Sequence, residues 1–312
     1  MATQMKDFFS KLNSLYSGIK NSVRSTNIIM DAKKHLKQIP QMDYVFAKLP
    51  RVLAYNTELG SDGAFRSNGW FNQIVISPTL TTDDYYEYAG TKMILLATLS
   101  HELCHANQQE CGLTEQYLKD ASFSDVFRVY KMTELEAALL EAIVENELVK
   151  QPEFEGFGVT TGRAFLYDYY LDKENGDIQK AKRDFVLSCW TNSCDNIQTP
   201  DIRLEMICQN AVRNWHREYT KNATEYVFSQ KYALKPTITP IQAIDACLQR
   251  MGLNGVIRSE FFLQNGSDNT KINNRKRTVT LLNQNGEKHC KYYMKSDEIK
   301  VTMFENKKAR TL

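Results

Sequence analysis

One stretch decides the fold of this chain: MILLATLSHELCHANQQEC, residues 93–111. Its first half is apolar and free of helix breakers, and its leucine spacing predicts a helix from about residue 82 to residue 111. Gly112 follows directly, at the position where glycine commonly ends a helix. The second half carries two of the five histidines of the chain, His101 and His105. We therefore expect a helix that crosses the hydrophobic core and carries polar side chains that are also buried.

The spacing of these histidines suits a metal ion. His101 and His105 are one helical turn apart, so both imidazoles can reach the same ion, and zinc accepts such nitrogens in a tetrahedral shell. Glu102 is offset by one position and can reach a water on the metal without being a ligand. The metal lowers the pKa of that water, and the carboxylate can accept its proton. The HExxH pattern therefore predicts a Zn²⁺-dependent peptidase in which a metal-bound water, activated by Glu102, attacks a peptide carbonyl.

A tetrahedral site of this kind needs a third protein ligand. The pattern favours a carboxylate near the start of the next helix, which is expected within residues 124–149. Glu134 is the preferred candidate. Glu136 has a competing use, because Thr133-x-x-Glu136 matches a capping box at a helix start. The alternatives that stay open are Glu136, Glu141 and His216.

Two segments resemble known families. Residues 99–108, LSHELCHANQ, resemble the HExxHA-x-Q helix of a group of bacterial metallopeptidases, and residues 134–138, ELEAA, resemble the E-x-E-A-D segment of gluzincins. The resemblance implies that Glu134 is the third zinc ligand. Ala138 departs from it, because gluzincins often have an aspartate there that supports a zinc-binding histidine. The Leu-Cys-His-Ala stretch is also similar to SprT-like proteases, which use a further downstream histidine.

The resemblance implies an α+β fold of the zincin type, mainly helical, with a small mixed sheet before the active-site helix. Two β-prone runs, residues 51–55 and 73–77, stand in the right place, and Gly63 is among the residues that mark turns between them. Zincins usually place an edge strand before the active-site helix, where a peptide substrate can add as a further strand. Residues 72–77 stand in the position of this edge strand, with an ordinary strand of the sheet as the alternative.

The chain divides into three predicted parts. Thr239-Pro240 and Gly252 mark the start and end of a late helix, and Asn285-Gly286 marks a hairpin turn in a β-rich C-terminal tail. The parts are an N-terminal helical segment (1–40), a zincin-like metallopeptidase domain (41–232), and a C-terminal helix with a β-hairpin appendage (233–312).

Composition limits the partners. The net charge is only +2, and 42% hydrophobic with 24% charged residues is an ordinary globular balance, so we expect a peptide or protein substrate and no nucleic acid. Seven cysteines at irregular spacing, without a CxxC pair, favour a reducing compartment. No apolar run is long enough for a signal sequence or a membrane span. A cytoplasmic protein is expected, and delivery into another cell by a specialised secretion system is compatible with it. Oligomeric state is not predicted.

Two other functions are compatible with the same motif. The chain could be an inactive, zinc-stabilised binding or scaffold protein, or a metallohydrolase that does not act on peptides. Peptide hydrolysis also needs a donor for the developing oxyanion, and the pattern does not choose among the residues able to serve. Those considered are Arg163, Tyr167, Tyr169, Tyr170 and His216.

Overall fold

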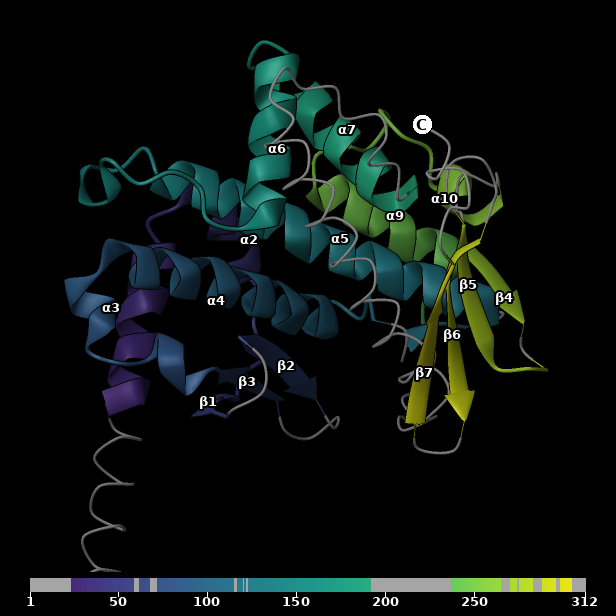
Figure 1. The fold of residues 1–312 in the computed structure, drawn as a ribbon, viewed down its shortest axis with the longest axis horizontal. Helices are drawn as coiled ribbons and strands as arrows, with labels where there is room; N and C mark the ends of the chain where they lie inside the picture. The colour runs from purple at the N-terminus through teal and green to yellow at the C-terminus, as the bar shows by residue number, and fades with distance from the viewer. Residues whose placement is uncertain are drawn as a thin grey trace, which may run out of the picture.

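The computed structural model shows a mixed α/β protein that is mainly helical (Figure 1). A small three-stranded sheet lies beside the first long helix, and further helices follow in sequence (Figure 1). The residues that the structure describes are 24–58, 62–67, 72–114, 117–119, 121, 123–191, 237–264, 270–273, 275–282, 288–295 and 298–304.

The small sheet is mixed, as expected. Its strands are β1 (Leu53–Thr57), β2 (Gly63–Ser67) and β3 (Asn72–Ile76), in the order β1-β3-β2. β1 runs parallel to β3, and β2 runs antiparallel to it. Of the two alternatives for residues 72–77, the edge strand is wrong and the ordinary sheet strand is what the structure has, because β3 has a strand on each side.

The edge strand that contacts the HExxH helix is β2, which the sequence pattern missed. Gly63 was expected in a turn, yet it is the first residue of this strand. A side chain there would collide with the helix, because an added Cβ would lie 2.6 Å from Thr98 Cγ2 and 3.0 Å from Glu102 Cγ. The glycine therefore permits a close approach of strand to helix rather than a reversal of the chain.

The HExxH helix is α4 (Ala89–Glu110), so its predicted start near residue 82 is wrong. The short α3 (Asp84–Glu87) precedes it, and Tyr88 between the two is extended, with ψ 110°. α4 packs against β2, β3 and the next long helix, and its leucines are fully buried. It ends as predicted: Gly112 has φ +69°, and the N–H of Leu113 donates to the carbonyl of Gln108 at 3.0 Å. A helix enclosed in this way can hold polar side chains away from bulk water.

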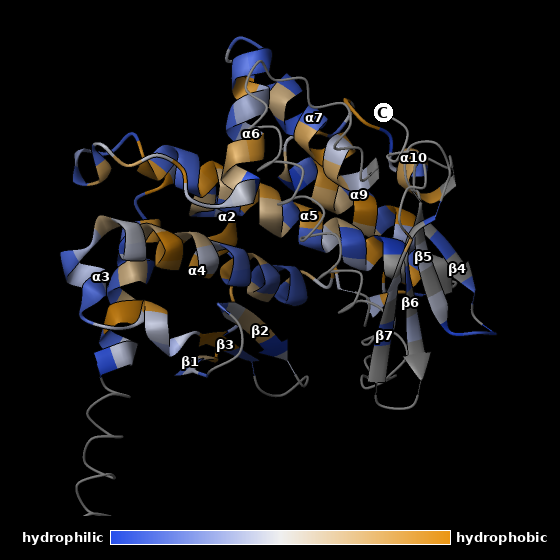
Figure 2. Cartoon of the chain, viewed as in Figure 1, coloured by the Kyte–Doolittle hydropathy of each residue, from blue (hydrophilic) through white to orange (hydrophobic). Residues whose placement is uncertain are grey.

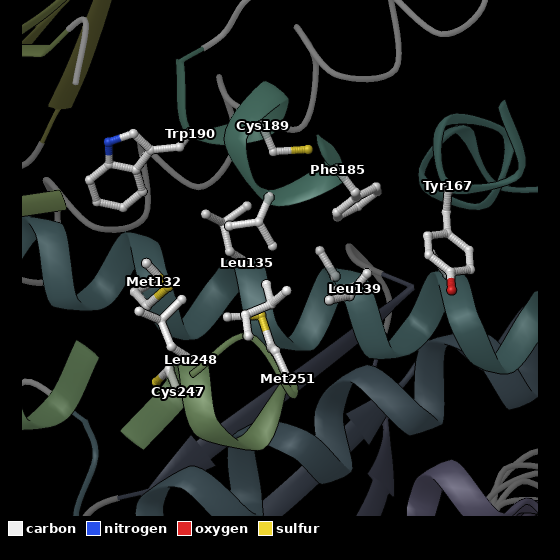
Figure 3. Packing of buried hydrophobic residues seen from close by; sticks show 14 of the residues in the cluster. Met132, Leu135, Leu139, Tyr167, Phe185, Cys189, Trp190, Cys247, Leu248 and Met251 are labelled. Carbon is white, nitrogen blue, oxygen red and sulfur yellow. The ribbon is translucent and has the colours of Figure 1, made fainter. Parts of the chain in front are cut away.

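The second long helix, α5 (Phe123–Leu148), lies between two hydrophobic cores. One of its faces, including Ala137 and Leu140, packs with α4 and the sheet. Another face, including Leu135 and Leu139, packs with the later helices, as Figure 3 shows. A helix shared by two cores is held firmly on both sides, and its remaining face is available for function.

The capping box predicted at Thr133 and Glu136 is wrong. α5 begins at Phe123, so both residues lie well inside the helix. The Thr133 hydroxyl donates to the Tyr130 carbonyl at 2.8 Å, which is an ordinary contact of a threonine within a helix. The side chain of Glu136 is therefore available for another role.

The later helices are α6 (Gly162–Lys173), α7 (Ile178–Thr191), α9 (Pro240–Arg250) and α10 (Ser259–Gln264). Hydrophobic residues recur along α5, α7 and α9 (Figure 2), and Trp190, Leu248 and Met251 pack around α5 (Figure 3). α9 starts and ends as predicted, with a Thr239–Gln242 capping box and Gly252 at φ +76°. α9 therefore shares a core with α5.

Short turns of helix connect these elements: η1 (Pro40–Met42), α2 (Asp43–Phe46), η2 (Pro78–Leu80) and η4 (Pro152–Phe154). Residues 24–36 are helical, and Ile28 and Leu36 are buried with α4 and the sheet. The part of the predicted N-terminal helical segment that precedes residue 24 lies outside the described part of the chain. Within that part, no helix combines the length and the apolar character that crossing a bilayer requires.

Near the C-terminus, four strands form an antiparallel sheet in the order β4-β5-β6-β7. They are β4 (Thr270–Asn273), β5 (Thr278–Leu282), β6 (Lys288–Lys295) and β7 (Glu298–Met303). The predicted turn residues Asn285 and Gly286 lie outside the described residues. The division at residues 40 and 232 stays a prediction.

Candidate metal centre

Two helices bring three of the predicted site residues together. α4 carries His101 and His105, and α5 carries Glu134. The two histidine Nε2 atoms are 3.0 Å apart, and the Glu134 carboxylate lies 3.6 Å from His101 Nε2 and 3.5 Å from His105 Nε2. Ligand atoms about 2.0–2.1 Å from a tetrahedral zinc are separated by about 3.3 Å. The spacing of these three groups therefore fits one ion.

The electrostatics of this cluster favour positive charge at its centre. Burial works to lower the pKa of His105, but the charge and hydrogen bond of Glu134 outweigh it and raise that pKa to about 9. Burial also opposes the shift at His101, where hydrogen bonds to Glu134 and Glu141 raise the pKa. The pKa of Glu134 is held well below its usual range by the two histidines, against the effect of burial. A site that binds protons this strongly is suited to a cation.

Glu102 lies between α4 and the edge strand. It is buried, and burial is the main reason that its pKa is raised, with the charge of Glu134 acting in the same direction. The backbone N–H of Phe65 in β2 donates a hydrogen bond to its carboxylate. Gly63 lies close to the same side chain, since an added Cβ would be 3.1 Å from Glu102 Oε1. The strand therefore holds this carboxylate in place next to the histidines.

Each histidine has a partner on its other ring nitrogen. Glu141 lies 2.9 Å from His101 Nδ1, and Gln108 Oε1 lies 2.9 Å from His105 Nδ1. Partners of this kind put the proton on Nδ1 and leave the Nε2 lone pair directed at the cluster. Glu141 supplies the carboxylate that was unassigned because residue 138 is alanine. Glu141 follows Glu134 by seven residues and so lies on the same face of the helix. This spacing could have identified Glu141 from the sequence as a residue near the site.

The face of α5 that carries Glu134 and Glu141 also carries Glu145. This buried carboxylate accepts hydrogen bonds from the backbone and hydroxyl groups of Thr160 and Thr161, just before α6. It fixes the start of α6, and Arg163 in the first turn of α6 then reaches the site. Arg163 pairs with Glu141, and its charge lowers the pKa of that carboxyl against the effect of burial.

The structure separates the other candidates from the cluster. Glu141 contacts His101 through Nδ1, on the opposite side of the ring from Nε2. Glu136 accepts instead from Gln108 and Arg250. Arg163 Nη1 lies 3.1 Å from His101 Nδ1, but both groups are donors, so Arg163 is held there by its pair with Glu141 and orients that carboxylate. The tyrosines considered as oxyanion donors are buried in the core around α5, and His216 lies outside the described residues; those tyrosines are Tyr167, Tyr169 and Tyr170.

Comparison of the chain with protein-family models, curated proteins and solved structures finds no significant match. The zincin-type fold and the likeness to gluzincins therefore stay predictions. What bears on function is the geometry of the site itself, in which two histidines, two acidic residues of α5 and a buried glutamate converge.

Proposed function

We propose that this protein is a zinc-dependent peptidase of the zincin type, with His101, His105 and Glu134 as the metal ligands. The observation that carries the proposal is the convergence of the two Nε2 atoms and the Glu134 carboxylate, with separations of 3.0, 3.5 and 3.6 Å. The Nδ1 partners of both histidines support it, because metal-binding histidines almost always have such a partner.

Glu102 is proposed as the general base. Zinc, when bound, would supply a water of lowered pKa and polarise the carbonyl under attack. Glu102 follows His101 directly on α4, and its carboxylate is buried and held by the Phe65 N–H. A buried carboxylate with a raised pKa accepts a proton more readily at neutral pH than an exposed one. Metal binding alone does not need a glutamate at position 102, so its presence favours a catalytic site over a purely structural one.

The free edge of β2 supports a peptide as the substrate. The N–H of Ser77 donates to the Asp62 carbonyl at 2.9 Å, and bonding alternates along an antiparallel ladder. Gly63 and Phe65 therefore direct their backbone groups away from β3, towards the edge, and none of the described strands pairs there. The Phe65 N–H is used by Glu102, which leaves its carbonyl and both Gly63 groups to pair with an extended peptide beside the metal.

The first experiment measures zinc content and peptide cleavage on the same preparations. Wild type should hold one zinc per chain and cleave members of a peptide library, read by mass spectrometry. Glu134→Ala and His105→Ala should lose zinc. Glu102→Gln should keep zinc and lose cleavage, because it removes the base and leaves the ligands.

Each departure has a defined meaning. A wild-type protein without zinc, even after reconstitution, would overturn the proposal. Zinc retained in Glu134→Ala would remove this residue from the ligand set. Zinc without turnover of any peptide would point to the zinc-stabilised binding protein or to a hydrolase of other substrates. Cleavage by Glu102→Gln would overturn the role of the base.

A further inference from the structure

A line of side chains connects the C-terminal helix α9 to the candidate metal centre. Arg250, the last residue of α9, donates from Nε to Glu136 Oε1 at 2.5 Å. The other oxygen of Glu136 accepts from Gln108 Nε2 at 3.0 Å. Gln108 Oε1 then lies 2.9 Å from His105 Nδ1. The line crosses α9, α5 and α4 and ends on a proposed metal ligand.

The orientation of Gln108 is fixed by its partners. Its Nε2 group donates to the Thr133 carbonyl at 2.9 Å as well as to Glu136, and both of these groups can only accept. The amide therefore has one favourable orientation, with Oε1 turned to His105. An acceptor at that place binds the proton of His105 on Nδ1 and leaves Nε2 free for the metal.

The ion pair of Arg250 and Glu136, at the start of this line, is buried. The Glu136 side chain is 0% exposed and that of Arg250 is 15% exposed. Tyr44 donates to Glu136 at 3.3 Å, and the Arg250 guanidinium lies 5.0 Å from the centre of the Tyr44 ring. A buried carboxylate needs its counter-charge, so the position of Glu136 depends on α9 being packed against α5.

We propose that Arg250, Glu136 and Gln108 are positioning residues, which hold His105 in the orientation and tautomer that bind the metal. The packing of α9, more than 100 residues downstream of Glu136, then sets the affinity of the site. The inference rests on the metal site of the proposed function, but it does not depend on peptide cleavage.

The test measures zinc affinity of the full chain by competition with a chromophoric chelator. Glu136→Gln and Arg250→Met should each weaken zinc binding about tenfold, since partners beyond the ligands typically contribute factors of that order. Glutamine at 136 must turn an NH₂ group either to Arg250 or to Gln108, so it breaks the line. Because Arg250→Met leaves a buried carboxylate without its counter-charge, Arg250→Lys serves if the first variant fails to fold, with a smaller loss expected.

Asn146→Leu is the matched control. Asn146 is also a buried polar residue of α5 with a side-chain hydrogen bond, but its partner is Asp168 at 3.0 Å and not a metal ligand. Its replacement should lower stability and leave zinc affinity within twofold of wild type, a change of about 0.4 kcal/mol or less. An equal loss of affinity in this variant would show that general loosening of α5 is the cause, and would overturn the inference.

A double-variant cycle tests whether Arg250 affects zinc affinity through Glu136 and Gln108 or only through the packing of α9. Arg250→Met should weaken zinc binding in wild type but add little in a Gln108→Leu background, because the connection to His105 is already broken. Zinc bound equally well by wild type and by all Glu136 and Arg250 variants would overturn the positioning role and leave the metal site standing. A wild type that binds no zinc would overturn both. Zinc binding that depends on Arg250, with no peptide cleaved, would overturn only the peptidase.

Discussion

Glu141 contacts the imidazole of a proposed metal ligand, a contact that the sequence pattern did not assign. Gluzincins, which residues 134–138 resemble, often have an aspartate at the position of Ala138, so the sequence pattern gave His101 no carboxylate partner. Here Glu141 lies 2.9 Å from His101 Nδ1 and is paired with Arg163.

Glu141→Gln should weaken zinc binding by roughly 10–100-fold without removing a ligand. An amide in place of the carboxylate is a weaker partner for the Nδ1 proton, and it loses its ion pair with Arg163. Competition with a chelator measures the effect. The Asn146→Leu variant is again the control, and equal zinc affinity in Glu141→Gln and wild type would contradict the role of this carboxylate.

Among the elements, β2 has the most direct bearing on the site. It is only five residues long, its sequence GAFRS contains no β-branched residue, and it begins with a glycine. Pairing with β3 on one side and close packing on α4 make it a strand. Through the Phe65 N–H it also holds Glu102, so the strand and the proposed base depend on each other.

Gly63→Ala should destabilise the protein by about 1–3 kcal/mol and reduce peptide cleavage, because overpacking moves β2 away from α4. The added Cβ would lie 2.6 Å from Thr98 Cγ2. Thr98→Ser removes that methyl group, so the double variant should recover part of both losses. Denaturant unfolding and the cleavage assay measure them.

Gly90→Ala is the control for this experiment. Its added Cβ would meet Phe157 Cε1 at 3.6 Å, an ordinary contact, and alanine is favoured over glycine in a helix. It should leave stability unchanged or increase it. A Gly63→Ala protein as stable as Gly90→Ala would show that β2 is not held closely on α4.

At the scale of the whole molecule, α5 joins two cores that would otherwise be separate. One contains the sheet, α4 and residues 28–36, and the other contains α6, α7 and α9. Glu134 and Glu141 lie on the same helix, so the protonation of the site is linked to the packing of both cores. We therefore expect changes at the site to appear in global unfolding.

The metal-free protein should lose stability as the pH rises above neutral. In the folded chain the pKa of His105 is raised from 6.5 to about 9, and that of His101 is also raised, so folding favours their protonated forms. This contribution is complete below pH 6.5 and is lost as the pH approaches 9. The pKa values of Glu134 and Glu141 are lowered from 4.5, so their contribution is complete above pH 4.5 and is lost as the pH falls.

Thermal unfolding in chelator, from about pH 5 to about pH 8.5, measures this dependence. Zinc replaces the protons, so its stabilising effect should grow as the pH rises. His105→Asn binds no proton at this position and should lose less stability above neutral pH. A melting temperature independent of pH between 6.5 and 8.5 in the metal-free wild type would contradict the raised pKa.

The features that the sequence by itself determined are local ones. The leucine spacing and Gly112 predicted α4 and its end, and Thr239 with Gly252 predicted both ends of α9. The pairing of His101 with His105 follows from the helical repeat alone. Such features depend on residues a few positions apart, and the physical rules that govern them act within one turn.

The tertiary structure alone decided the features that depend on distant contacts. β2 exists because it pairs with β3 and fits against Thr98, and neither contact can be read from its five residues. From the sequence, Glu136 matched a capping box at a helix start. In the structure α5 begins at Phe123, so Glu136 lies within the helix. Its actual partner, Arg250, is 114 residues away. Local sequence carries no information on which buried charges will meet, because packing of separate elements brings them together.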